Sequence, residues 1–346
     1  MKKIPLNAEN TKITGRTYNY ANTLALVLSG SGCEFSFTGK RLDISISCDE
    51  KTYLSGRACN YPRIAIICDG RFTVKRVLEN PTEKYNIISS DIPVTKNIKI
   101  IKLSEAAFSL ALVHEAETDD NAVISPLPGK NLKIEFIGDS ITCGYGVDNC
   151  NVYSEFSTAA ENCMKSYAYL TADMLNADYS LFSYSGYGII SGYTPDGVRN
   201  TREVLPQYYE STGFSYGTIN DIKPHEIKWD FSRFVPDIIV INLGTNDNSF
   251  CIKNEWAFGE FEDKYIDFLI TVRKNNPAAK IICAIGMMNS ETSPHVINAA
   301  ERFGDAYFFE FKMQDGMLGF SCDFHPSEDT QRYAAEELTE FIKKII

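Results

Sequence analysis

The chain has 346 residues, of which 44% are hydrophobic and 23% charged, and its formal net charge is −11. This composition is that of a globular protein of about two domains, and it excludes disorder of the whole chain. The acidic balance argues against a nucleic-acid partner, because phosphate binding needs clustered Lys and Arg. The apolar runs are far shorter than the roughly 20 residues that span a bilayer.

Residues 1–125 carry the period-two alternation of half-buried strands. Two such strands are separated by Thr38-Gly39-Lys40, which we expect to form a turn, and Asp69-Gly70 is a hairpin signal. The pattern predicts an antiparallel β-sandwich or jelly roll over residues 1–125. The predicted strands include Cys33–Phe37, Leu42–Cys48, Arg63–Cys68, Phe72–Leu78, Ile98–Leu103 and Phe108–His114.

The pattern changes after the proline-containing segment Glu117–Lys130, where we place the domain boundary. Short, fully apolar runs then alternate with helical periodicity, which predicts an α/β domain with a mostly parallel sheet over residues 131–346. The last helix follows Pro326 and has early acidic residues. The strands predicted here are Lys133–Ile137, Ser180–Tyr184, Ile238–Leu243 and Lys280–Ile285.

Three polar loops follow three of these strands, and they are Gly138-Asp139-Ser140, Ser185–Gly188 and Gly244–Asp247. Ligands of an open parallel sheet bind beyond the carboxyl ends of its strands, so the three loops should converge. His325 comes directly before the last helix and can reach the same edge.

These residue types suit acyl transfer. A serine hydroxyl needs a base to remove its proton, so Ser140 is the predicted nucleophile and His325 the predicted base. Asp323 could orient the histidine. The predicted oxyanion donors are the backbone N–H groups of Ser140 and Gly186 and the side-chain amide of Asn246.

The sequence gives less support to metal, nucleotide or cofactor chemistry. The ten cysteines form no C-x-x-C pair, so a zinc site is not expected, and we predict reduced thiols. Phosphate-loop and dinucleotide motifs are absent, and no metal or other cofactor is predicted. Asp139, Tyr187 and Trp256 are weak candidates for substrate binding. The remaining histidines are interpreted as structural or exposed, and they are His114, His225 and His295.

The four blocks Gly138-Asp139-Ser140, Gly186, Gly244–Asp247 and His325-Pro326 resemble those of SGNH (GDSL-type) hydrolases across residues 131–346. The motifs of the first half resemble the β-sandwich domain of carbohydrate esterase family 2, and they are Gly15-Arg16-Thr17, Ser29–Gly32, Phe37-Thr38-Gly39 and Asp69-Gly70. The resemblance implies a jelly roll with a flavodoxin-like α/β/α SGNH domain. It assigns Ser140 as nucleophile, His325 as base, and Gly186 and Asn246 to the oxyanion hole.

One position departs from the SGNH pattern. Most such hydrolases carry Asp three residues before the histidine, where this chain has Cys322, and Asp323 lies one residue closer. Some members of carbohydrate esterase family 2 work with a Ser–His dyad, so both a triad through Asp323 and a dyad stay open.

The expected function is that of a serine esterase that removes O-acetyl groups from oligo- or polysaccharides. The alternatives are an SGNH lipase or thioesterase acting on other acyl esters, and a non-catalytic glycan-binding protein with a relic site. No membrane or obligatory protein partner is expected. Lys2 and Lys3 precede no apolar stretch, which predicts a cytoplasmic protein, or a secreted one if a leader has been removed.

Overall fold

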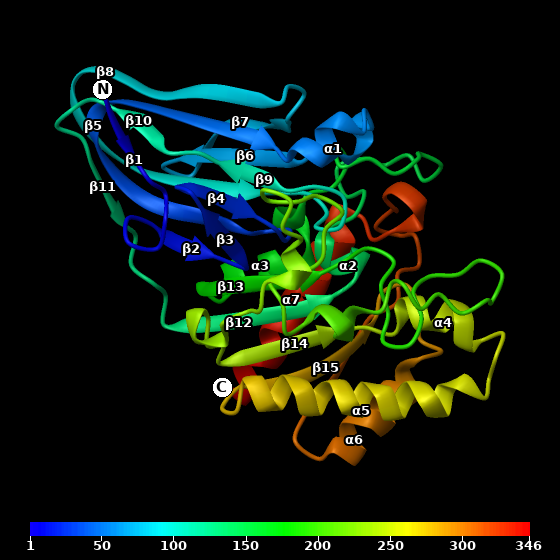
Figure 1. Cartoon of the computed structure of the whole chain (residues 1–346). Coiled ribbons are helices and arrows are strands. Elements are labelled where there is room, and N and C mark those ends of the chain that lie inside the picture. Colours follow the sequence, from blue (N-terminus) through cyan, green and yellow to red (C-terminus); the bar gives the residue numbers. More distant parts are fainter. The chain divides into compact units, whose positions relative to one another are not determined.

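The computed structural model describes residues 1–346 and contains two separate sheets (Figure 1). The first sheet is antiparallel and has 11 strands, with the central order β3-β4-β9-β5-β8-β6-β7. Its strands are β1 (Lys2–Ile4), β2 (Lys12–Thr14), β3 (Thr17–Tyr20), β4 (Thr23–Leu26), β5 (Gly32–Cys48), β6 (Arg63–Cys68), β7 (Arg71–Val77), β8 (Thr82–Lys102), β9 (Ala111–Val113), β10 (Ala116–Thr118) and β11 (Val123–Pro126).

The turn predicted at Thr38-Gly39-Lys40 is wrong, because β5 runs through it as one strand. The pairing of β5 with β8 shifts register between Gly39 and Arg41, as a β-bulge does. The Asp119 carboxylate accepts hydrogen bonds from the amides of Lys40 and Arg41 at 2.7 and 3.0 Å. The backbone amides at the bulge are therefore hydrogen-bonded, and the strand continues through it.

Alternate residues along β5 are buried, and their side chains form part of the core of this sheet. Phe35, Phe37, Ile44 and Ile46 alternate along β5 and are fully buried in one hydrophobic cluster. The short helix α1 (Glu50–Leu54) was not predicted, since five residues are too few to show helical periodicity. Asp49 caps it by accepting from the amide of Thr52 at 2.9 Å.

The second sheet has five parallel strands in the order β13-β12-β14-β15-β16. They are β12 (Leu132–Gly138), β13 (Ala177–Ser183), β14 (Ile238–Asn242), β15 (Lys280–Gly286) and β16 (Tyr307–Phe311). Four of them overlap predicted strands. Strand β16 was missed: it is a half-exposed edge strand, and Glu310 interrupts its short aromatic run.

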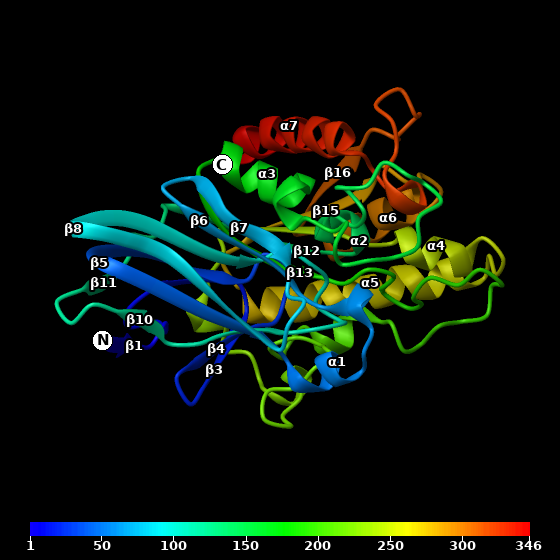
Figure 2. The same ribbon diagram turned by 90° about the horizontal axis from the view of Figure 1, so that it is seen from above.

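Helices cover both faces of the parallel sheet, with α3 and α7 on one face and α5 and α6 on the other (Figures 1 and 2). The α-helices are α2 (Ser140–Cys143), α3 (Tyr167–Met174), α4 (Thr245–Cys251), α5 (Ala257–Asn275), α6 (Ser293–Phe303) and α7 (Glu328–Ile345). Six 3-10 turns complete the chain: η1 (Ala58–Asn60), η2 (Cys163–Lys165), η3 (Leu205–Tyr208), η4 (Pro224–Glu226), η5 (Phe231–Arg233) and η6 (Cys322–Phe324).

The predicted fold class is confirmed: an antiparallel β unit and an α/β unit with a parallel sheet. The parallel sheet has the flavodoxin-like order 2-1-3-4-5. In such sheets the ligand crevice lies at the carboxyl ends of the strands, where the strand order reverses. Here that point lies between β12 and β14, which the loops of Ser140 and Asn246 follow.

Contacts divide the chain into two units. The first comprises Met1–Gly129, Ser157–Glu161 and Glu210–Trp229, and the second Lys130–Phe156, Asn162–Tyr209 and Asp230–Ile346. All candidate site residues lie in the second unit. No helix of the chain is both long enough and apolar enough to cross a bilayer. All ten cysteines are free thiols.

Candidate active site

Ser140 stands at the turn between β12 and α2. Asp139 caps this helix by accepting from the amide of Ile141 at 3.0 Å, and Ser140 is the first helical residue. The amide of a first helical residue has no intrahelical acceptor. A side chain at Gly138 would place its Cβ 2.1 Å from Thr142 Oγ1, so glycine is required for this tight turn.

His325 meets Ser140 directly. Its Nε2 lies 2.9 Å from Ser140 Oγ, and its Nδ1 lies 3.1 Å from the backbone carbonyl oxygen of Cys322. A carbonyl oxygen can only accept, so Nδ1 must carry the hydrogen of a neutral imidazole. Nε2 is then left with a free electron pair that faces the serine hydroxyl.

The surroundings of His325 hold the ring in this neutral form. Burial lowers the pKa of His325 from 6.5 to about 4, although its bond to Cys322 and the charge of Asp323 act in the opposite direction. The ring of Tyr145 packs against the imidazole, with centroids 4.2 Å apart and planes 31° apart. At neutral pH His325 is therefore an uncharged, oriented proton acceptor.

The carboxylate of Asp323, the predicted partner of His325 in a triad, makes no hydrogen bond to the imidazole in this geometry. Its backbone has a left-handed φ of 51°, and its exposed carboxylate accepts from the hydroxyl of Tyr145 at 2.6 Å. The spacing of two residues leaves the carbonyl of Cys322, rather than the carboxylate, against Nδ1. Asp323 acts on the imidazole through its charge and its backbone, and both raise the pKa of His325.

The predicted oxyanion donors come from the loops after β13 and β14. Gly186 has a φ of 83°, which glycine adopts without strain, and its amide has no acceptor within the protein. The side-chain amide of Asn246 donates to Tyr187 O at 2.9 Å and to Asp139 Oδ2 at 3.3 Å. Asn246 is therefore linked to the residue that precedes Ser140.

The Asp247 carboxylate ties these two loops together. It accepts backbone hydrogen bonds from Ile189, Ile190 and Ser191 at 2.7–3.1 Å. Burial raises the pKa of Asp247 to about 6 and that of Asp139 to about 7. Both carboxyl groups are fully buried, so they hold the loop backbones by hydrogen bonds from the interior of the protein.

The weak substrate-binding candidates are placed differently from what the sequence indicated. Asp139 is completely buried, and Tyr187 is 3% exposed with its ring 5.0 Å from that of Tyr184. Neither side chain is accessible to a sugar, because both are buried. Trp256 is 69% exposed at the start of α5, where its ring packs on Phe250 at 6.1 Å.

Tyr145 was missed by the sequence reasoning. It lies between Gly144 and Gly146, which have left-handed φ values of 72° and 63°. A side chain at Gly146 would meet Cys322 Cβ at 2.5 Å, so this tight loop brings Tyr145 up to the histidine segment. The two flanking glycines were the available signal.

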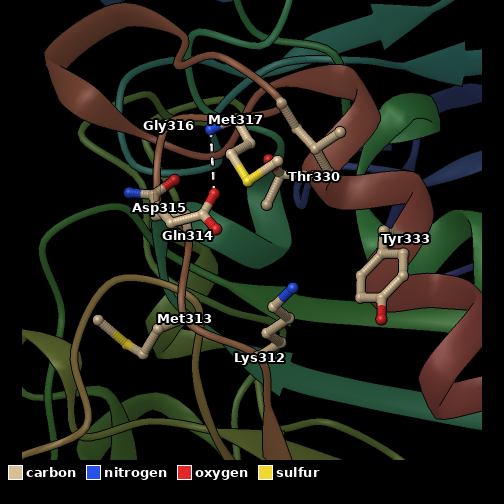
Figure 3. Close-up of a pocket in the computed structure, with 9 residues that line it drawn as sticks. Lys312, Met313, Gln314, Asp315, Gly316, Met317, Thr330 and Tyr333 are labelled. Carbon is tan, nitrogen blue, oxygen red and sulfur yellow. Dashed lines mark hydrogen bonds between the residues drawn. The ribbon is translucent and has the colours of Figure 1, made fainter.

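A cavity of about 210 Å³ borders the segment that leads to His325. The side chains of Lys312 and Tyr333 face each other across it, with the ammonium group 5.7 Å from the ring (Figure 3). Its apolar lining is exposed and consists of Met313, Met317 and Leu318.

The parallel sheet, the serine after its first strand and the histidine before its last helix define an SGNH-type hydrolase domain. The chain belongs to the GDSL-like lipase/acylhydrolase family, whose model matches residues 136–333. Residues 13–128 match the N-terminal region of carbohydrate esterase 2, which confirms the resemblance seen in the sequence.

The relatives include the cellulase/esterase CelE of Acetivibrio thermocellus, 31% identical over 91% of this chain. This chain spans 37% of that protein's length. An acetylxylan esterase/glucomannan deacetylase of Cellvibrio japonicus is 26% identical over 88% of this chain and 81% of its own length. Among solved structures, an acetyl xylan esterase of Butyrivibrio proteoclasticus has a TM-score of 0.87 at 25% identity, covering 99% of this chain and 98% of that chain.

Proposed function

We propose that this protein is a serine esterase that removes O-acetyl groups from carbohydrates. The observation that carries the chemistry is the contact of Ser140 Oγ with the unprotonated Nε2 of His325. The substrate class is supported by the Cellvibrio and Butyrivibrio relatives, which are named for the deacetylation of xylan or glucomannan.

In the first step Ser140 Oγ attacks the acetyl carbonyl carbon while His325 Nε2 takes the hydroxyl proton. The carbonyl oxygen becomes negative and accepts hydrogen bonds from the amides of Ser140 and Gly186. Asn246 joins them by exchanging its long 3.3 Å bond to Asp139 for one to the oxyanion. Each such donor contributes about 3 kcal/mol of transition-state stabilisation.

In the second step the tetrahedral intermediate collapses, and His325 gives its proton to the departing sugar oxygen. The acetyl group stays on Ser140 as an ester. Water then attacks this ester with the same base, and acetate leaves as Ser140 recovers its proton. Every proton transfer in this cycle uses His325 Nε2.

We propose a Ser–His dyad rather than a triad. The carbonyl of Cys322 fixes the tautomer and orientation of His325, which is the task that a carboxylate performs in a triad. The carboxylate of Asp323 adds the attraction of its charge for the imidazolium that forms during the reaction, and no hydrogen bond to the ring.

The test compares Ser140→Ala, Asp323→Ala and the unmodified protein on 4-nitrophenyl acetate and on acetylated glucomannan. Ser140→Ala should lose at least about 10³-fold in kcat, because the nucleophile is gone. Asp323→Ala should lose less than about tenfold, whereas disabling the carboxylate of a working triad costs about 10⁴-fold. Equal rates for Ser140→Ala and the unmodified protein would refute an acyl-enzyme on Ser140.

A second candidate, an esterase for longer acyl groups, is favoured by one observation. The cavity beside the histidine segment is lined in part by Met313, Met317 and Leu318, which are side chains that an acyl chain can contact. Hydrolysis of 4-nitrophenyl acetate, butyrate and octanoate separates the two. An acetyl-specific enzyme loses kcat/KM as the chain lengthens, and a rise toward octanoate would favour the second candidate.

A further inference from the structure

Tyr145 connects the two segments that carry the reacting atoms. Its amide donates to Ser140 O at 3.0 Å, and its hydroxyl donates to the Asp323 carboxylate at 2.6 Å. Its ring packs against the imidazole of His325, with centroids 4.2 Å apart. The side chain of Tyr145 thus contacts the base, while its backbone is bonded to the residue of the nucleophile.

The ring of Tyr145 has little room to move. Tyr145 is buried, and its ring also packs on that of Phe156, with centroids 5.4 Å apart. The next residue, Gly146, lies so close to Cys322 that a Cβ there would be 2.5 Å from Cys322 Cβ. The loop of Tyr145 and the segment before the histidine are therefore in direct contact, and the tyrosine hydroxyl joins them by a hydrogen bond.

The backbone that presents the Asp323 carboxylate is strained. Asp323 and Phe324 have successive left-handed φ values of 51° and 56°, which residues other than glycine rarely adopt. Such strain persists only where the surrounding structure imposes it, and it gathers at functional sites. Here Asp323 N donates to Val152 O at 3.1 Å, and the ring of Phe324 packs on that of Tyr153 with centroids 5.9 Å apart. These contacts hold the conformation in which the carboxylate meets Tyr145.

The contacts around the base form a closed cycle. The chain leads from His325 back two residues to Asp323, a hydrogen bond joins Asp323 to Tyr145, and ring packing joins Tyr145 to His325. A hydroxyl–carboxylate bond of this length is of the charge-assisted kind, which is about twice as strong as a neutral one. Any rotation of the imidazole away from Ser140 has to disturb the ring packing that this bond holds in place.

We propose that Tyr145 and Asp323 act as one positioning unit for His325. The inference deepens the proposed esterase function and rests on it. In a triad the carboxylate orients the histidine by a direct hydrogen bond, whereas here it anchors the tyrosine whose ring packs on the imidazole. The carbonyl of Cys322 selects the tautomer, and the pair keeps Nε2 facing Ser140.

A positioning unit acts on the rate rather than on binding. His325 Nε2 takes a proton from Ser140 and later returns it, so both steps depend on where the imidazole stands. A small misplacement of a catalytic group slows the reaction steeply. Neither Tyr145 nor Asp323 has to contact the ester for this effect. Loss of the pair should therefore lower kcat and leave KM nearly unchanged.

The experiment is a double-mutant cycle on 4-nitrophenyl acetate with Tyr145→Phe, Asp323→Ala and the combination of the two. Each single variant should lower kcat about fivefold, because each removes the same hydrogen bond. KM should stay within about twofold of that of the unmodified protein. The combined variant should also lose about fivefold, whereas independent effects would multiply to about 25-fold.

Asp323→Asn separates the hydrogen bond from the charge. Its side-chain oxygen still accepts the hydrogen of the Tyr145 hydroxyl, so this variant should keep at least about half of the kcat. Tyr307→Phe is the matched control, since Tyr307 is 43% exposed and begins β16, at the amino end of the parallel strands and opposite the site. Its kcat should equal that of the unmodified protein. Circular dichroism shows whether each variant is folded.

The outcomes separate this inference from the proposed function. If Ser140→Ala hydrolyses 4-nitrophenyl acetate as fast as the unmodified protein, the esterase mechanism itself fails. If Ser140→Ala is inactive but Tyr145→Phe keeps full kcat, or the combined variant loses the product of the two single losses, the positioning unit is overturned. A loss in Asp323→Asn as large as that in Asp323→Ala would also overturn it, by assigning the effect to the charge.

Discussion

His325 shows how much of the candidate site depends on the surroundings of one side chain. Burial lowers its pKa to about 4, and the carbonyl of Cys322 selects the tautomer with a hydrogen on Nδ1. The ring of Tyr145, which packs against the imidazole, limits the rotation of His325. None of these contacts is with a carboxylate, so the base is neutral and oriented without a buried charge.

This environment predicts an unusually acidic limit for activity. The reaction needs neutral His325, so protonation below its pKa removes the base. The kcat/KM for 4-nitrophenyl acetate should stay level from pH 7 down to about 5 and fall about tenfold per pH unit below about 4. An inflection near the ordinary histidine value of 6.5 would contradict the prediction.

The same pKa bears on stability. The folded pKa lies below the unfolded value, so the neutral histidine stabilises the fold above about pH 6.5, and this contribution is lost as pH falls toward 4. Circular dichroism at each pH therefore has to accompany the rate measurements, to separate loss of the base from unfolding.

At the scale of elements, one buried side chain joins three helices. Gln331 on α7 is 1% exposed; its Nε2 donates to Ile141 O of α2 at 3.0 Å, and its Oε1 accepts from Tyr167 N of α3 at 2.7 Å. Ile141 follows Ser140 directly. Helix α7 thus supports the turn of the nucleophile as well as the histidine that precedes it.

Gln331→Ala should lower the free energy of unfolding by about 1–3 kcal/mol, since it leaves the buried amide of Tyr167 without a partner and removes one of the two donors to Ile141 O. Denaturant titration measures this change. Arg332→Ala is the control, because the neighbouring side chain is 55% exposed and its removal should shift stability by less than about 0.5 kcal/mol. Similar losses for the two variants would show that Gln331 is not a link between helices.

At the scale of the whole molecule, the net charge of −11 bears on substrate choice. A negative protein repels anionic polymers, and salt screens that repulsion over about 10 Å at 0.1 M. A neutral acetylated glucomannan experiences neither effect. The charge is therefore compatible with the neutral polysaccharides of the proposed function.

The corresponding measurement is kcat/KM at about 0.02 and 0.5 M NaCl. For acetylated glucomannan the two values should agree within about twofold, since no long-range charge term enters binding. For acetylated polygalacturonate, an anionic polymer, kcat/KM should rise with salt. A strong salt dependence on glucomannan would point to charged groups in its binding site.

The sequence by itself determined the fold class and the polar loops. Burial along a strand follows the periodicity of its own residues, so both sheets could be predicted from local patterns. The strands preceding Ser140, Gly186 and Asn246 were recognisable in the same way, and the parallel arrangement brings their loops to one edge.

Only the tertiary structure decided which groups surround the reacting atoms. The left-handed backbone of Asp323 turns its carboxylate to Tyr145 and leaves a carbonyl on His325, and no residue pattern encodes that choice. Burial of Tyr187 and the pairing of Tyr153 with Phe324 likewise depend on chain segments far apart in the sequence. Periodicity reports which face of an element is buried, whereas these contacts depend on backbone angles that long-range hydrogen bonds impose.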